Sequence, residues 1–109
     1  MKLPNSKSII IPKEKLTNYL LSETHPTGRF KARFFRNLGF DENNVKVFET
    51  CIHKLAEKPI SESSTSPYGT KYIIDGEIET PSGKIIKVRT VWIIENGQNR
   101  PRFITIYPV

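Results

Sequence analysis

The spacing of apolar residues changes once along this chain, near Pro59, and this change limits the folds that it can adopt. Before Pro59 the apolar residues keep helical spacing, as in Leu16, Tyr19 and Leu20. After residue 68, three segments alternate apolar and polar residues, which is the period of a β-strand. We therefore expect an α+β domain, in which N-terminal helices pack on a C-terminal antiparallel meander sheet of three to four strands.

Proline, glycine and acidic residues mark the boundaries of these elements. Pro12 begins the first helical pattern, since the N–H that it lacks would be unpaired at the start of a helix. Gly39 is expected to end a second helix that begins near residue 29, and Asp41 to cap a third that continues to about Lys58. With 109 residues, we predict a flexible lead-in at 1–8 and a single domain at 9–109, with helices within about 12–58, a polar loop at 59–67 and the sheet at 68–108.

Composition narrows the class of function. The net charge is +6 and the isoelectric point is about 9.6, so the domain should attract polyanions, chiefly nucleic acid; the alternative is a soluble protein with surplus lysine. The single Cys51 cannot form an internal disulfide, which fits the cytoplasm. No Cys/His cluster has the spacing of a zinc site, and we expect no metal or cofactor. We also expect no signal peptide and no contact with a membrane.

Strand alternation distributes the side chains of the predicted sheet onto two faces. One face is almost wholly apolar and should pack on the helices; it comprises Tyr72, Ile74, Ile78, Ile86, Val88, Trp92, Ile94, Ile104 and Ile106. The other face mixes polar and apolar residues: Asp75, Glu77, Lys87, Arg89, Thr105 and Tyr107 with Ile73, Val91, Ile93 and Phe103. This mixture fits either a shallow cleft with a polar floor or an amphipathic outer face with cross-strand charge pairs.

The stretch HPTGRFKARFF, residues 25–35, combines basic, aromatic and histidine side chains. On a helix its arginines, among them Arg29 and Arg33, line one side, whereas Lys31 falls within the apolar arc. Lys31 either extends along its stem to solvent or directs its ammonium group into the cleft, where it could bind a phosphate. His25 lies in a loop and is either a surface residue or an acid–base group, since imidazole titrates near neutral pH.

The ordered set HPTGRFKARFF, LGF, SPYGTKY, VRTVWIIENG and FITIYP resembles an uncharacterised bacterial domain family, DUF6883, over about residues 9–108. The layout of this family is similar to that of the barnase–colicin–RelE group of metal-independent ribonucleases, and members of such families occur as toxins. Its polar motif positions match His25, Lys31, Arg89, Thr105 and Tyr107, which the resemblance implies are catalytic. Strand alternation independently places the last three on the mixed face.

The resemblance implies a metal-independent endoribonuclease that cleaves tRNA or mRNA in the cytoplasm by attack of the 2′-hydroxyl. It further implies the toxin of a toxin–antitoxin or related conflict system, with a small acidic antitoxin or immunity protein as partner. The candidate RNA-binding residues are Arg29, Arg33, Lys87, Trp92 and Arg102, of which Trp92 is either a core residue or a base-stacking one. Two other functions stay open, namely a non-catalytic nucleic-acid-binding module and a protein-interaction accessory domain.

Overall fold

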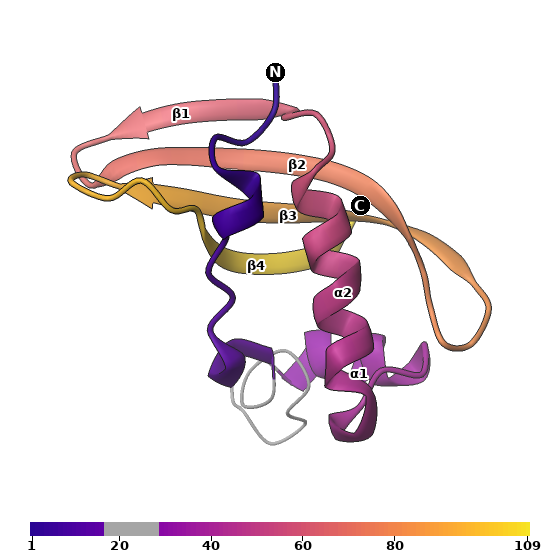
Figure 1. Cartoon of the computed structure of the whole chain (residues 1–109). Helices are drawn as coiled ribbons and strands as arrows, with labels where there is room; N and C mark the ends of the chain where they lie inside the picture. The colour runs from indigo at the N-terminus through magenta and orange to yellow at the C-terminus, as the bar shows by residue number, and fades with distance from the viewer. Residues whose placement is uncertain (17–28) are drawn as a thin grey trace.

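The computed structural model describes residues 1–16 and 29–109, and at residues 29–31 the backbone alone. Four strands form one antiparallel sheet in the order β1-β2-β3-β4, and α2 and the N-terminal segment cross the same face of it (Figure 1). The elements in chain order are η1 (Ser6–Ser8), α1 (Arg29–Asn37), η3 (Glu42–Asn44), α2 (Val45–Ala56), β1 (Glu62–Ser66), β2 (Gly69–Glu79), β3 (Ile85–Glu95) and β4 (Arg102–Pro108). The expected α+β meander is confirmed, with four strands.

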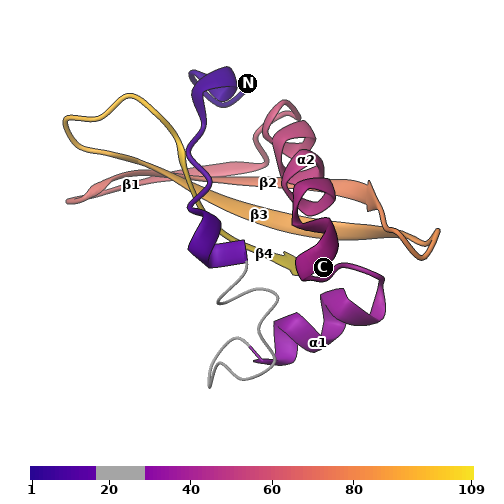
Figure 2. The same ribbon diagram turned by 60° about the horizontal axis from the view of Figure 1, so that its bottom comes forward.

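The helical part follows the predicted boundaries closely. Residues 13–16 are helical, and the remainder of the first predicted helix lies outside the described residues. In Figure 2, α1 lies beside the start of α2. α2 ends at Ala56, slightly before the predicted end at Lys58. No helix of the described chain is long and apolar enough to cross a membrane.

The junction between α1 and α2 is fixed by local hydrogen bonds. Gly39 has a φ of 99°, and its N–H donates to the carbonyl of Arg36 at 3.0 Å. The next N–H, of Phe40, donates to the carbonyl of Phe35 at 3.1 Å, which completes a Schellman motif. Asp41 then caps the short 3-10 helix η3, since its side chain accepts a backbone N–H at 2.7 Å, and η3 leads directly into α2. The predicted helix end at Gly39 is confirmed, and Asp41 caps the turn that precedes α2.

α2 packs on the apolar face of the sheet. Phe48 and Leu55 of α2 are buried in one cluster with Ile74 of β2 and Trp92 of β3. The Phe35 ring of α1 reaches the same cluster, with its centroid 5.0 Å from that of Phe48. The predicted core face is thus confirmed where α2 crosses β2 and β3.

A β-bulge corrects the predicted faces of β4. The register between β3 and β4 shifts at Val91 and Trp92, so that Phe103 lies opposite Trp92. Phe103 is therefore wholly buried in the core and Ile104 is only half-buried, whereas alternation predicts the reverse. A bulge adds one residue to one strand and so inverts the faces beyond it. Thr105 and Tyr107 follow the bulge and keep their predicted face.

The segment 59–67 contains strand β1, although the sequence predicts a polar loop there. All five residues of β1 are exposed, and the strand pairs with β2 alone at the edge of the sheet. An edge strand with no buried side shows no alternation of apolar residues, so hydrophobic periodicity does not reveal it.

The expected flexible lead-in at residues 1–8 is also corrected, because this segment packs on the domain. Leu3 is 3% exposed and belongs to the core cluster together with Ile9. The carbonyl of Met1 accepts a hydrogen bond from the N–H of Ile60 at 2.7 Å. The N-terminal segment therefore contributes to the same core as the helices.

Candidate active site

The sheet face opposite α2, which we call the Arg89 face, carries most of the described site residues. Asp75 of β2 lies directly opposite Arg89 of β3, and Tyr107 of β4 lies opposite Arg89 on its other side. Thr105 of β4 lies opposite Val91, which is the next residue after Arg89 on the same face of β3. Directly opposite residues of antiparallel strands project to the same side of a sheet. The structure thus brings Arg89, Thr105 and Tyr107 together around strand β3, as alternation predicts.

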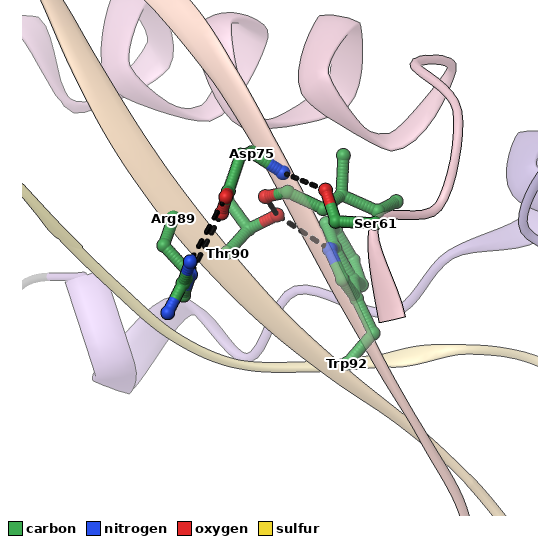
Figure 3. Close-up of polar contacts among 6 residues, drawn as sticks. Ser61, Asp75, Arg89, Thr90 and Trp92 are labelled. Carbon is green, nitrogen blue, oxygen red and sulfur yellow. Dashed lines mark hydrogen bonds and ion pairs between the residues drawn. The ribbon is translucent and has the colours of Figure 1, made fainter. Parts of the chain in front are cut away.

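Arg89 forms a two-point ion pair with Asp75. Its Nε donates to Oδ1 at 2.8 Å and its Nη2 to Oδ2 at 3.0 Å (Figure 3). The Arg89 side chain is 36% exposed and that of Asp75 is 19% exposed, so solvent still reaches the pair. Because a guanidinium is a planar fork, two bonds fix its plane and therefore the directions of its remaining donors.

The charges of this pair support one another. Hydrogen bonds from Arg89 hold the pKa of the Asp75 carboxyl below its ordinary value, and partial burial opposes them. The hydrogen bond to Asp75 and, second in size, that to Tyr107 raise the pKa of the Arg89 guanidinium above its ordinary value. Both groups are therefore ionised at neutral pH. The pair as a unit is neutral. It can therefore bind an anion mainly through oriented hydrogen bonds and less through net positive charge.

Two predicted RNA-binding residues share the Arg89 face. Lys87 is exposed and lies opposite Glu77. Arg102 is exposed at the start of β4 and forms an ion pair with Glu95 at 3.0 Å. Both basic side chains are therefore accessible on the same side of the sheet as the ion pair.

The prediction that Trp92 contacts RNA is wrong. The Trp92 side chain is wholly buried in the core on the α2 side. Its indole N–H donates to the hydroxyl of Thr90 at 2.9 Å, and that hydroxyl donates to the carbonyl of Ile74 at 2.8 Å (Figure 3). Both buried polar groups are thereby satisfied, so Trp92 is a structural residue.

The predictions on α1 and before it are described only in part. Arg33 is exposed on α1. Arg29 and Lys31 belong to α1, but their side chains lie outside the described part of the chain, as does the whole of His25. Their functional roles stay predictions.

Asp75 belongs to the site, although it is not among the catalytic or RNA-binding residues predicted from the sequence. The sequence does carry a signal for it, because Asp75 and Arg89 are equally distant from the turn between β2 and β3. Counting outward from that turn pairs them across the hairpin. The interpretation of the mixed face as an outer face with charge pairs is thus realised at Asp75 and Arg89.

A hollow of about 470 Å³ lies between α2 and the end of β2. Val47, Cys51 and Lys54 of α2 and Glu79 of β2 contribute to its lining. Burial raises the pKa of the Cys51 thiol, which makes it a poor nucleophile at neutral pH. No predicted site residue of the described chain lines this hollow, so we do not assign the chemistry to it.

The fold and the Arg89 face define a class: a small basic α+β domain whose helices cover one side of a four-stranded antiparallel meander. The chain belongs to the family described as Domain of unknown function (DUF6883), whose pattern matches residues 2–109. This confirms the family that the motifs predict.

A solved structure shares this fold. It is described as a contact-dependent growth inhibition toxin–immunity protein complex from Klebsiella pneumoniae 342. One of its chains is 23% identical to this protein with a TM-score of 0.73, and the match covers 92% of this chain and 99% of that one. At this identity the likeness shows the fold alone. No curated protein matches the sequence.

Proposed function

We propose that this protein is a metal-independent endoribonuclease that uses the Arg89 face. The observation that carries the proposal is the oriented Arg89–Asp75 pair on the central strands β2 and β3, with Tyr107 and Thr105 of the edge strand β4 beside it. A net charge of +6 supports an RNA substrate, since phosphates dominate the affinity of proteins for nucleic acids.

The proposed reaction needs no metal because RNA carries its own nucleophile. The 2′-hydroxyl attacks the adjacent phosphorus, its proton passes to a base, and the bond to the 5′-oxygen breaks as that oxygen gains a proton. The products are a 2′,3′-cyclic phosphate and a 5′-hydroxyl. The protein has to position the phosphodiester, stabilise the crowded phosphorane and supply the acid and the base.

Each predicted catalytic residue has a role in this scheme. Arg89 and Lys31 would bind the scissile phosphate, with Arg89 oriented by Asp75. Thr105 and Tyr107 would hydrogen-bond the phosphate or orient the ribose. His25 and Tyr107 are the two candidates for proton transfer, and the sequence leaves open which is the acid.

The proposal extends to a toxin with an acidic protein partner. One chain of a toxin–immunity protein complex has the same fold as this protein. The basic charge of this protein suits a toxin that acts on RNA, and a protein that covers a basic face should be acidic. We therefore propose a small acidic immunity protein or antitoxin as partner, and cytoplasmic tRNA or mRNA as substrate.

The decisive experiment is incubation of the purified protein with total cellular RNA in excess EDTA, followed by mapping of the 3′ ends. We expect discrete fragments that end in a cyclic phosphate. Arg89→Ala should lower the rate by about 100-fold or more, as loss of one donor to a transition state does in other enzymes. His25→Ala should also lose most of the activity, and Lys46→Ala on α2 is the control for lost positive charge.

Three results would contradict the proposal or parts of it. Cleavage by Arg89→Ala or His25→Ala at the wild-type rate would remove that residue from the mechanism, and a strict need for metal would exclude the mechanism. Intact RNA after incubation with folded protein would favour a non-catalytic module. Salt-dependent RNA binding would then indicate a nucleic-acid-binding module, and a co-purifying protein without RNA affinity would indicate an interaction domain.

A further inference from the structure

Tyr68 is an exposed aromatic residue at one end of the sheet. It lies in the turn between β1 and β2, and it is 78% exposed. Among the described side chains, five aromatic rings are instead completely buried in the core, those of Phe35, Phe40, Phe48, Trp92 and Phe103. A ring exposed to this extent adds little to the stability of the fold, and it is accessible to a ligand.

The backbone that carries Tyr68 is held rigidly by the neighbouring β3–β4 loop. The Asn96 N–H donates to the carbonyl of Tyr68 at 2.9 Å, and the Asn96 side-chain amide donates to the carbonyl of Pro67 at 2.7 Å. Gly69 packs so tightly that a side chain there would collide with the backbone of Ile94. In Figure 1 the β1–β2 turn and the β3–β4 loop lie together at one end of the sheet. The ring is thus presented from a fixed support, which lowers the entropy that binding would cost.

Basic residues outnumber acidic ones in the chain around Tyr68. Residues 63–74 and 96–109 include no aspartate or glutamate, and Glu95, which lies opposite Gly69, forms an ion pair with Arg102 at 3.0 Å. On the Arg89 face, Lys71 lies opposite Ile93, and Arg102 lies opposite the same residue from the other side. An exposed ring at the end of a face that carries basic side chains is a combination that binds single-stranded nucleic acid, because bases stack on the ring while cations follow the phosphates.

We propose that Tyr68 is a base-stacking contact for an unpaired nucleotide of the RNA, distant from the cleaved bond; this rests on the proposed ribonuclease function. The partner of Tyr68's neighbour Gly69 is Glu95, at the end of β3. At about 3.3 Å per residue along β3, Tyr68 lies roughly 20 Å from Arg89. RNA bound at both places would extend along the strands, past Arg102 and Lys71, for a few nucleotides.

The test compares a long and a short probe made of 2′-O-methyl RNA, which cannot be cleaved because its 2′-hydroxyls are blocked. The short probe is a dinucleotide, and the long one is an unstructured oligonucleotide able to span from Arg89 to Tyr68. Tyr68→Ala should weaken binding of the long probe about tenfold or more and leave the dinucleotide unaffected. Tyr68→Phe should bind both probes like the wild type, since stacking needs the ring alone.

Two further variants make the test specific. Ile85→Ala removes another exposed apolar side chain, 65% exposed, at the opposite end of the sheet, and it should bind both probes like the wild type. Tyr68→Trp should keep the affinity for the long probe, and its fluorescence should be quenched when that probe binds. On a cleavable long RNA, Tyr68→Ala should raise KM without lowering kcat, as loss of a uniform binding contact does.

The outcomes separate this inference from the proposed function. Equal affinities of Tyr68→Ala and the wild type for the long probe would overturn the stacking role, and so would an equal loss in Ile85→Ala. Loss of an acidic protein partner by Tyr68→Ala, with RNA binding intact, would overturn it in favour of a protein-docking hairpin. Absence of cleavage by the wild type would refute the ribonuclease, whereas the uncleavable probes would still show whether Tyr68 binds RNA.

Discussion

Asp75 determines how Arg89 can meet a ligand. A guanidinium that hangs free in solvent must lose rotational freedom when it binds an anion. Two hydrogen bonds to Asp75 already restrict Arg89, and the raised pKa of its guanidinium keeps it charged. We regard Asp75 as a positioning residue for Arg89 and not as a group that touches the substrate.

Replacement of Asp75 by asparagine should lower the free energy of unfolding by at most about 1 kcal/mol at neutral pH, because solvent reaches the pair. The folded-state pKa of Asp75 lies below its ordinary value. Its stabilisation is therefore complete above the unfolded-state pKa of about 3.9, and it is lost as the pH falls through the folded-state pKa. Urea denaturation of wild type and Asp75→Asn across this acid range should show the two stabilities converge.

Glu77→Gln is the matched control, since it removes an exposed carboxylate from the same strand and the same face. It leaves the partner of Arg89 in place, so we expect a smaller loss of stability at neutral pH. Equal losses in the two variants, or a difference for Asp75→Asn that persists at low pH, would refute the structural role given to this pair.

Single site residues were predictable from the sequence where the face of a strand decides their position. Arg89, Thr105 and Tyr107 lie on strands with clear alternation, and their shared face follows from that alone. The same argument places Trp92 on the buried face, where the structure has it. The prediction that Trp92 binds RNA went against this argument. Tyr68, the most exposed of the described aromatic residues, lies in a turn, where alternation gives no information.

At the scale of elements, the turn at the end of α1 sets where α2 begins. Gly39 has a φ of 99°, in the left-handed region that side chains disfavour. A Cβ there would also approach the Pro81 side chain to 2.9 Å. The glycine thus serves both the Schellman motif and the contact with the turn after β2.

Gly39→Ala should therefore cost the backbone strain of about 1–2 kcal/mol and a further amount for the collision with Pro81. Gly83→Ala is the control, because Gly83 has a similar φ of 90° and an added Cβ would meet nothing within 4 Å. We expect a larger drop in the urea midpoint for Gly39→Ala than for Gly83→Ala. Equal midpoints would show that the contact with Pro81 relaxes without cost.

Elements were predictable where they bury an apolar side, and less so elsewhere. The end of α1 and the long strands β2 and β3 follow from glycine, turn and alternation signals. β1 has no buried residue, and its pairing with β2 depends on the free edge that β2 offers. The bulge in β4 depends on how Phe103 packs against Trp92, at 5.4 Å between ring centroids, and local sequence does not encode that contact.

At the scale of the whole molecule, net charge and its location make different predictions for RNA binding. A net charge of +6 attracts any polyanion over a distance that salt screens. A defined binding face adds short-range phosphate contacts, each of which contributes to the salt dependence of the affinity. Variants of equal net charge can therefore separate the two effects.

Two double variants make this comparison. One combines Lys71→Gln and Lys87→Gln and removes two exposed charges from the Arg89 face, and the other combines Lys46→Gln and Lys54→Gln and removes two from α2. Both double variants have the same net charge, two below the wild type. We expect the first to weaken RNA binding more, and to lower the slope of log affinity against log salt by up to about 2. The second should lose only the general attraction, with its slope close to that of the wild type. Equal losses in the two variants would mean that RNA is held by overall charge, and a larger loss in the α2 variant would move the binding face to the helical side.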